Sequence, residues 1–138
     1  MPALFQKLNL RAEREILVLE APASFEQELA ALNGIRVVRS IKGATLDFVL
    51  VFVTRRAQIG RIWKSLAARA QGDAIIWFAY PKGSSKRYRS DINRDNGWDE
   101  VRTCGWDTVR QVAIDEDWSA LRFRRNEFIN RRAAPRSR

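Results

Sequence analysis

Two short runs of apolar residues constrain the fold of this chain more than any other feature of its sequence. The first is Asp47–Val53 (DFVLVFV) and the second is Ala74–Tyr80 (AIIWFAY). A strand that is apolar at nearly every position, as the first run is, suits the centre of a parallel sheet, where both of its faces are covered. The residues between the runs predict a helix over 55–71, capped by Thr54. Its buried stripe is the set Ile59, Ile62, Trp63, Leu66 and Ala70.

Further strands are predicted on both sides of this central unit. Their ranges are Glu15–Glu20, Arg36–Ile41, Thr108–Ile114 and Trp118–Arg124. The polar link Asp115–Asp117 is short, so the last two strands form an antiparallel hairpin. Residues 1–14 are predicted as a polar lead-in that includes a short helix.

Two more helices complete the pattern. Ser24 and Gln27 have the spacing of a capping box, and the helix that they begin places Phe25, Leu29 and Leu32 on one face. The other helix is predicted from Ser90 or Asp91 to about Cys104. Its inward positions are Ile92, Trp98, Val101 and Cys104.

Strands that alternate with helices predict an α/β fold. We expect a three-layer Rossmann-like domain, with a mainly parallel sheet, a C-terminal antiparallel hairpin and helices on both faces. Residues 1–125 form this single domain in the prediction. Residues 126–138 form a basic C-terminal tail, which we expect to be partly disordered.

Composition excludes several kinds of chemistry. The 138-residue chain has no histidine, which rules out Ser-His-Asp and Cys-His catalysis and metal sites with histidine ligands. Its single cysteine, Cys104, has no partner for an internal disulfide and suits a reducing cytoplasm. No signal peptide is visible, and the longest apolar runs are far shorter than the ~20 residues of a membrane helix. We therefore expect a cytoplasmic protein with no membrane partner.

The net charge of +9 is concentrated in two segments. Residues 82–94 carry five cations and one acid, and residues 122–138 carry seven arginines and one acid, which leaves −1 for the rest of the chain. Clustered positive charge favours anionic partners. The alternative interpretation is a solvated surface with a loose basic tail.

A candidate anion site lies in the segment 81–91, directly after the Ala74–Tyr80 run. A bend that ends a parallel strand offers backbone amides, hydroxyls and positive charge at the edge of the sheet where ligands usually bind. The candidate ligand-binding residues are Lys82, Gly83, Ser84, Ser85 and Lys86. The spacing is not that of a P-loop, and a solvated connection that needs Gly and Ser for its turn remains an alternative.

Two longer phrases carry a resemblance to known proteins. The stretch from Asp47 to Gly83 and the closing VRQVAIDEDWSALRFRR resemble the middle and the terminal hairpin of Rossmann-like methyltransferase domains. Residues of about 8–125 are also similar to a bacterial family of small Rossmann-like proteins, a domain of unknown function. The shared motifs are VLEAP, WFAYPKGSS and DEDWSALRF. This resemblance implies the fold and says little about activity.

The chain departs from methyltransferases where their cofactor binds. The loop from Glu20 to Phe25 has no glycine, and Ser40-Ile41-Lys42 stands where an acidic residue that holds a ribose is expected. We therefore expect no adenosyl cofactor. The acidic cluster Asp115–Asp117 suggests turn capping or pairing with arginines more than a metal site, so no metal is expected either.

Nucleic-acid contact is a separate possibility. The candidate contacts are Arg87, Tyr88, Arg89, Arg131 and Arg132, and Tyr88 is predicted to be exposed between its two arginines. No zinc finger or other sequence-specific recognition motif is present. Among the remaining aromatic residues, Trp63 and Trp77 are predicted in the core, whereas Trp98 and Trp106 are candidates to cover an edge of the sheet.

Three functions therefore remain open. The sequence favours a non-catalytic module that binds a small anion, such as a phosphate or a nucleotide, at the loop 81–91. The first alternative is a protein that binds nucleic acid or an acidic protein through residues 82–94 and 122–138. The second is a divergent methyltransferase-like enzyme. Oligomeric state is not determined by the sequence.

Overall fold

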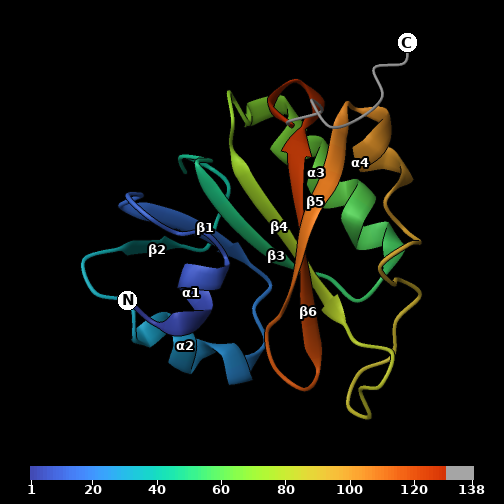
Figure 1. The fold of residues 1–138 in the computed structure, drawn as a ribbon, viewed down its shortest axis with the longest axis horizontal. Helices are drawn as coiled ribbons and strands as arrows, with labels where there is room; N and C mark the ends of the chain where they lie inside the picture. Colours follow the sequence, from blue (N-terminus) through green and yellow to red (C-terminus); the bar gives the residue numbers. More distant parts are fainter. Residues whose placement is uncertain (130–138) are drawn as a thin grey trace.

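The computed structural model describes residues 1–129, which form one six-stranded sheet between helices (Figure 1). The strand order is β2-β1-β3-β4-β6-β5. The strands are β1 Glu15–Leu19, β2 Arg36–Val38, β3 Phe48–Phe52, β4 Ile75–Pro81, β5 Trp106–Ala113 and β6 Trp118–Arg125. The first four are parallel, and β6 is antiparallel to both β4 and β5. The predicted fold class is confirmed.

The apolar runs form the centre of the sheet, as their composition requires. All five residues of β3 are buried, and this strand lies between β1 and β4. Leu50 pairs with Val18 on one side and with Trp77 on the other. All seven residues of β4 are buried as well. Helices on both faces remove these side chains from water, which is the main favourable term in folding.

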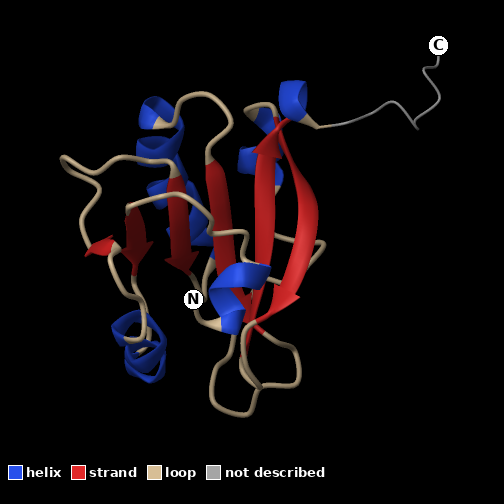
Figure 2. Ribbon diagram, turned by 60° about the vertical axis from the view of Figure 1, so that its left-hand side comes forward, coloured by secondary structure: helices blue, strands red, loops and turns tan. Residues whose placement is uncertain are grey.

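Each face of the sheet has its own layer of helices (Figure 2). On one face lie α1 Ala3–Lys7, the 3₁₀ turn η1 Ala23–Phe25 and α2 Glu26–Ala30, whose apolar residues share a core cluster with Phe48, Leu50 and Phe52. On the other face lie α3 Arg56–Arg69 and α4 Asp99–Thr103, which pack on Val49, Val51 and Phe78. A last 3₁₀ turn, η2 Asn126–Phe128, follows β6.

The N-terminal segment contributes more to the core than its sequence indicated. Phe5 and Leu8 are fully buried, and Leu10 is 3% exposed. The indole of Trp77 donates a hydrogen bond to the carbonyl of Leu8 at 2.9 Å. Because β4 gives this segment both an apolar surface and a donor, residues 1–10 cover one face of the sheet.

Two predicted helix starts are wrong. Ser24 makes no capping hydrogen bond, because the chain enters α2 through a 3₁₀ turn. The helix predicted from Ser90 or Asp91 is replaced by an irregular loop over residues 82–98, and only α4 is helical. Gly97 has φ of 112°, a conformation that an α-helix cannot contain.

The start of α3 is held by side chains from two segments. Gln58 accepts hydrogen bonds through Oε1 from the amides of Thr54 and Arg55, at 2.7 and 2.9 Å. Asp91, in the loop after β4, accepts one from the amide of Arg56 at 2.8 Å. These carboxylate and amide oxygens satisfy helix N–H groups that have no intrahelical acceptor. Thr54 is therefore a donor to Gln58 and not the predicted cap.

Trp98 and Trp106 are core residues, which corrects their predicted place at an edge. They are 0% and 2% exposed, and the Trp106 ring meets Trp63 edge-on at 5.3 Å. Within residues 1–129, no helix combines the length and the apolar character needed to cross a bilayer.

Candidate functional site

The loop after β4 begins where the parallel strands have their C-terminal ends. We call this side of the sheet one edge, and the side where these strands begin the opposite edge. β1, β3 and β4 run in the same direction, so Leu19, Phe52 and Pro81 end at one edge. Open α/β sheets bind ligands in the crevice outside this edge. The bend Lys82–Lys86 therefore lies beyond the C-terminal ends of the parallel strands, as the sequence predicted.

Ser85 ties the first part of the loop to the β5–β6 turn. Its hydroxyl donates to Asp117 Oδ1 at 2.8 Å and accepts from the amides of Arg87 and Tyr88, both at 3.2 Å. The amide of Lys82 donates to the carbonyl of Asp117 at 2.8 Å. The Ser85 hydroxyl is thus already fully used within the protein. Its role is to shape the bend.

The turn Asp115–Asp117 caps backbone amides and pairs with an arginine, which is the role that its sequence favoured. Asp115 Oδ1 accepts hydrogen bonds from the amides of Asp117 and Trp118, at 2.8 and 2.9 Å. Asp117 also pairs with Arg87, with 3.7 Å between Nε and Oδ2. Among the described residues, no group of His, Cys, Asp or Glu side chains is arranged to hold a metal ion.

Tyr88 is half-buried, which corrects the prediction that it is exposed. Its ring lies 4.8 Å from the ring of Trp118 at the start of β6. Together with the Ser85 contacts, this tilted ring contact fixes the middle of the loop against the hairpin.

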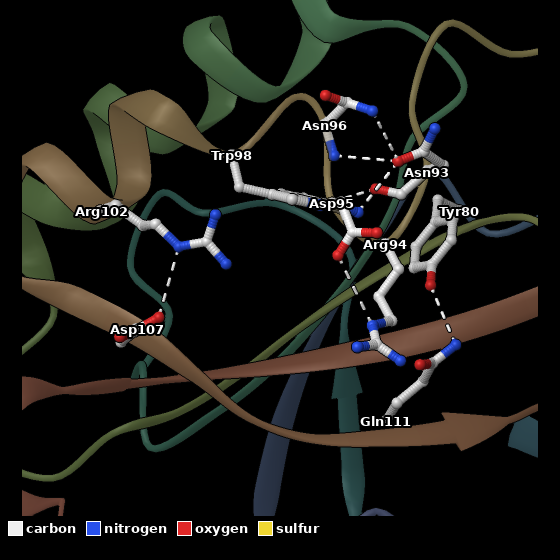
Figure 3. Close-up of polar contacts among 9 residues, drawn as sticks. All are labelled: Tyr80, Asn93, Arg94, Asp95, Asn96, Trp98, Arg102, Asp107 and Gln111. Carbon is white, nitrogen blue, oxygen red and sulfur yellow. Dashed lines mark hydrogen bonds and ion pairs between the residues drawn. The ribbon is translucent and has the colours of Figure 1, made fainter.

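The end of the loop is held by a compact polar turn (Figure 3). Asn93 Oδ1 accepts from the amides of Asp95 and Asn96, both at 2.9 Å. The indole of Trp98 donates to the carbonyl of Asn93 at 2.8 Å. The loop is therefore irregular in backbone conformation but anchored by side chains at several points along its length.

Tyr80 lies beneath this turn. Its ring is 5.8 Å from that of Trp98, and its hydroxyl accepts from Gln111 Nε2 at 3.1 Å (Figure 3). Burial raises the pKa of Tyr80 above its usual value, because the phenolate loses hydration. The phenol therefore stays neutral and acts as a hydrogen-bonding group.

The loop separates two pockets of different charge. The first, which we call the Lys82–Arg89 pocket, has a volume of about 410 Å³ and no lining carboxylate. It is lined by Pro81, Lys82, Gly83, Ser85, Tyr88, Arg89, Ser90 and Ile92. The side chains of Lys82 and Arg89 have no hydrogen-bond or ion-pair partner among residues 1–129.

The second pocket has a volume of about 650 Å³ and mixes both signs of charge. Its lining residues are Ser84, Lys86, Arg87, Glu116 and Asp117. Carboxylates repel an anion and attract the same cations that would bind it. The second pocket is therefore a poorer anion site than the Lys82–Arg89 pocket.

The five candidate ligand-binding residues are thus divided between two surfaces. Lys82, Gly83 and Ser85 line the Lys82–Arg89 pocket, whereas Ser84 and Lys86 line the mixed pocket. Of the candidate nucleic-acid contacts, Arg89 joins the first set and Arg87 pairs with Asp117. Arg131 and Arg132 lie outside the described residues.

The arginines at the end of β6 lie at the opposite edge of the sheet. Trp77, near the start of β4, pairs with Arg122. Arg124 donates two hydrogen bonds to Asp73, and Arg125 donates to the carbonyls of Ala70 and Gly72. These arginines therefore do not share a surface with the loop after β4.

Their charges act within the protein. The hydrogen bonds from Arg124 hold the pKa of Asp73 below its usual value. The guanidinium of Arg125 lies 4.7 Å from the ring centre of Trp106, a cation–π geometry. Burial lowers the pKa of Arg122, whose Nε has no hydrogen-bond partner in the described structure.

The position that holds the cofactor in methyltransferases has different chemistry here. Glu20, directly after β1, has φ of 60°, in the left-handed region, at a place where glycine is the usual solution. Just after β2, Arg39 donates to both carboxylate oxygens of Glu26, at 2.9 and 2.7 Å. A guanidinium has only N–H donors, so Arg39 cannot accept hydrogen bonds from ribose hydroxyls as an acidic residue does.

The charge count along the sequence did not reveal one further basic region, because acidic residues elsewhere in the chain balance its positive charge. Residues 55–69 contain five cations and no acid. Arg61 lines a third pocket, of about 330 Å³, beside the ends of β1 and β2. Its other lining residues are Leu19, Arg39, Ser40, Ile41, Ile62 and Ser65. A charge count over the helix alone, instead of over the remainder of the chain, finds this signal.

Solved structures with a similar fold include a putative methyltransferase and a fibrillarin. No family model matches the chain, and no curated protein matches it significantly. A putative type 11 methyltransferase from Sulfolobus solfataricus aligns with a TM-score of 0.52 at 5% identity, over 89% of each chain. The Methanococcus jannaschii fibrillarin pre-rRNA processing protein aligns with a TM-score of 0.51 at 12% identity, over 84% of this chain and 68% of that one. The chain has a methyltransferase-like Rossmann fold. At these identities the similarity describes the fold and does not assign an activity.

Proposed function

We propose that this protein is a non-catalytic module that binds a small anion, such as a phosphate or a nucleotide, in the Lys82–Arg89 pocket. The single observation that carries this proposal is a pocket with two unpaired cations and no carboxylate at the ligand-binding edge of the sheet. Charges that are fixed near each other repel, and an anion that binds between them relieves this repulsion.

The construction of the loop supports the same conclusion. The Ser85–Asp117 hydrogen bond and the Asp91–Arg56 contact hold both flanks of the pocket before any ligand arrives. A site whose residues are already fixed loses less conformational entropy when it binds. The Ser90 hydroxyl accepts from the amide of Ile92 at 3.0 Å and donates to the Ile92 carbonyl at 3.5 Å, which holds this wall of the pocket in place.

Thermal unfolding in the presence of phosphate, pyrophosphate and mononucleotides tests this proposal. We expect these anions to raise the Tm, and we expect Lys82→Ala combined with Arg89→Ala to abolish the shift, because both pocket cations are removed. Binding at 100 times Kd stabilises a protein by about 2.7 kcal/mol. Chloride at equal ionic strength controls for screening.

Lys86 provides the matched control. It lies on the same loop and carries the same charge as Lys82, but it lines the mixed pocket with Glu116 and Asp117. Lys86→Ala should therefore preserve the anion-dependent shift. The proposed site would be contradicted if no anion of the panel changed the Tm, or if Lys86→Ala reduced the shift as much as Lys82→Ala/Arg89→Ala.

A divergent methyltransferase-like enzyme is the second candidate, and it is favoured by the fold of the structural neighbours. Against it stand the loop at Glu20, which has no glycine, and the Arg39–Glu26 pair. Calorimetric titration with S-adenosylmethionine separates the two candidates. Binding of the cofactor that survives the Lys82→Ala/Arg89→Ala replacement would support the enzyme and displace the module.

A further inference from the structure

We infer that the natural anion is the phosphodiester backbone of a single-stranded polynucleotide, which follows a path of cations from the Lys82–Arg89 pocket to the outer face of α3. This inference rests on the proposed anion site and names the class of ligand for it. It also replaces the pair of basic segments indicated by the sequence, because Arg124 and Arg125 lie at the opposite edge and bind within the protein.

The path first crosses three adjacent strand ends. The Lys82–Arg89 pocket follows β4, Arg55 follows β3, and the Arg61 pocket lies beside the end of β1. These strands are neighbours in the order β1-β3-β4, so the ends of β1 and β4 are about 10 Å apart. Neither pocket is lined by a carboxylate.

The path continues along the solvent face of α3. Successive residues of a helix are rotated by about 100°, which places the exposed residues Ala57, Arg61, Lys64, Ser65 and Ala68 on one face. The other residues of this face, Ala57, Ser65 and Ala68, have small side chains that leave room for a backbone to approach the two cations. The helix rises about 13 Å from Arg55 to Lys64.

Two acidic residues near this path are already paired, whereas the carboxylates of Glu20, directly after β1, and of Glu100 have no hydrogen-bond or ion-pair partner among residues 1–129. Asp91 is bound to the amide of Arg56, and Glu26 is bound to Arg39. Glu100 lies against Gly60, on the side of α3 that faces α4, where a Cβ on Gly60 would be 2.6 Å from its carboxylate. The side-chain cations of Arg55, Arg61 and Lys64 have no hydrogen-bond or ion-pair partner within residues 1–129.

A row of unpaired cations fits a polymer better than a small ligand. One phosphate neutralises the cations of one pocket and leaves the next cations unpaired, whereas a polynucleotide places a phosphate at each. The shape of the path indicates a single strand, because it turns from the edge of the sheet onto the outer face of a helix. Duplex DNA has a persistence length of about 150 base pairs and does not follow such a turn.

Fluorescence anisotropy with a labelled twelve-nucleotide single strand, measured over a range of salt concentrations, tests this inference on the full chain. Each phosphate contact contributes a slope of about −0.7 to the plot of log K against log salt for a single strand. We expect Arg61→Gln combined with Lys64→Gln to reduce the slope by about 1.4, since two contacts are lost.

Lys7→Gln combined with Arg14→Gln is the matched control. It removes the same charge, but Lys7 lies on α1, on the other face of the sheet, and Arg14 precedes β1 at the opposite edge. The control should retain the original slope. If both double variants reduced the slope equally, the strand would be attracted by net charge alone, and the inference would be overturned. Equal affinity for a duplex, or for polyglutamate, would overturn it as well.

The same proteins separate this inference from the proposed function. If phosphate raises the Tm through Lys82 and Arg89 but the oligonucleotide does not bind, only the polymeric ligand is wrong. If phosphate has no effect, the small-anion pocket itself is wrong. The Arg61→Gln/Lys64→Gln variant should keep its phosphate-dependent Tm shift, because it leaves the pocket after β4 intact. Loss of that shift would count against an extended path.

Discussion

The loop after β4 and the last residues of β6 are both rich in arginine, yet their cations have different roles. In the loop, Lys82 and Arg89 line a pocket without carboxylates, and their side chains have no hydrogen-bond or ion-pair partner in the described structure. At the end of β6, Arg124 binds Asp73, and Arg125 binds two carbonyls and stacks on Trp106. The same residue type thus stabilises the fold at one edge of the sheet and remains available to a ligand at the other.

This difference follows from what each segment encounters as it leaves the sheet. β6 runs antiparallel to β4, so its last residues reach the end of α3, where helix carbonyls and Asp73 need donors. The loop after β4 meets the acidic turn on one side only, and Asp117 there is occupied by Ser85 and Arg87. Counting charges along the chain cannot distinguish the two environments.

The largest expected effect is on stability at the end of β6. Arg125→Ala removes hydrogen bonds to the carbonyls of Ala70 and Gly72 and the contact with Trp106. We expect a loss of about 2 kcal/mol in the free energy of unfolding, since charge-assisted hydrogen bonds are lost and a buried carbonyl keeps no partner. Urea denaturation measures this change. A loss of stability no larger than that of a typical surface substitution would show that Arg125 does not stabilise the fold, and the arginines at the end of β6 would then not differ from the cations of the loop.

A smaller effect is expected within the loop. Ser85→Ala leaves the amides of Arg87 and Tyr88 without their acceptor and Asp117 without its donor. We expect a loss of about 1 kcal/mol and faster hydrogen exchange at residues 86–90. Ser84→Ala is the matched control, because its side chain is exposed and lines the other pocket. If both variants behave alike, Ser85 does not anchor the bend.

Acid should weaken the β6 edge by a smaller amount. Asp73 has a folded-state pKa below its usual 3.8, so its pairing with Arg124 stabilises the protein above that pH and is lost as the pH falls through the folded-state pKa. Because both partners are partly exposed, we expect only about 0.5 kcal/mol. Denaturation of the wild type and of Asp73→Asn between about pH 2 and 6, the range in which a carboxyl group titrates, measures this loss of stability. If the free energies of unfolding of the two proteins differ by a constant amount across this range, the pairing of Asp73 with Arg124 does not contribute to the pH dependence.

The smallest effect on stability is expected for Arg89→Gln. Its side chain has no partner in the described structure, so the free energy of unfolding should change by less than about 0.5 kcal/mol. The same substitution should nevertheless weaken the phosphate-dependent rise in Tm. Arg124→Gln should do the reverse, with lower stability and an unchanged response to phosphate. If the two variants exchange these behaviours, the assignment of the edges is wrong.

The sequence by itself determined the order of elements and the class of fold. The apolar runs at β3 and β4 and the helical stripe of α3 are local patterns, and a short run of apolar residues bounded by turn residues suits a strand that is covered on both faces. It also placed the bend after β4 at the edge where ligands bind, because parallel strands all end at the same edge.

Only the tertiary structure decided which polar groups remain available. Ser85 and Asp117 are far apart along the chain, as are Arg124 and Asp73, and each contact forms only when β6 pairs with β4. The irregular loop over residues 82–98 also depends on such contacts, since Asp91, Tyr88 and Trp98 find their partners on other elements. Hydrogen bonds and ion pairs depend on distance in space, and a sequence records distance only along the chain.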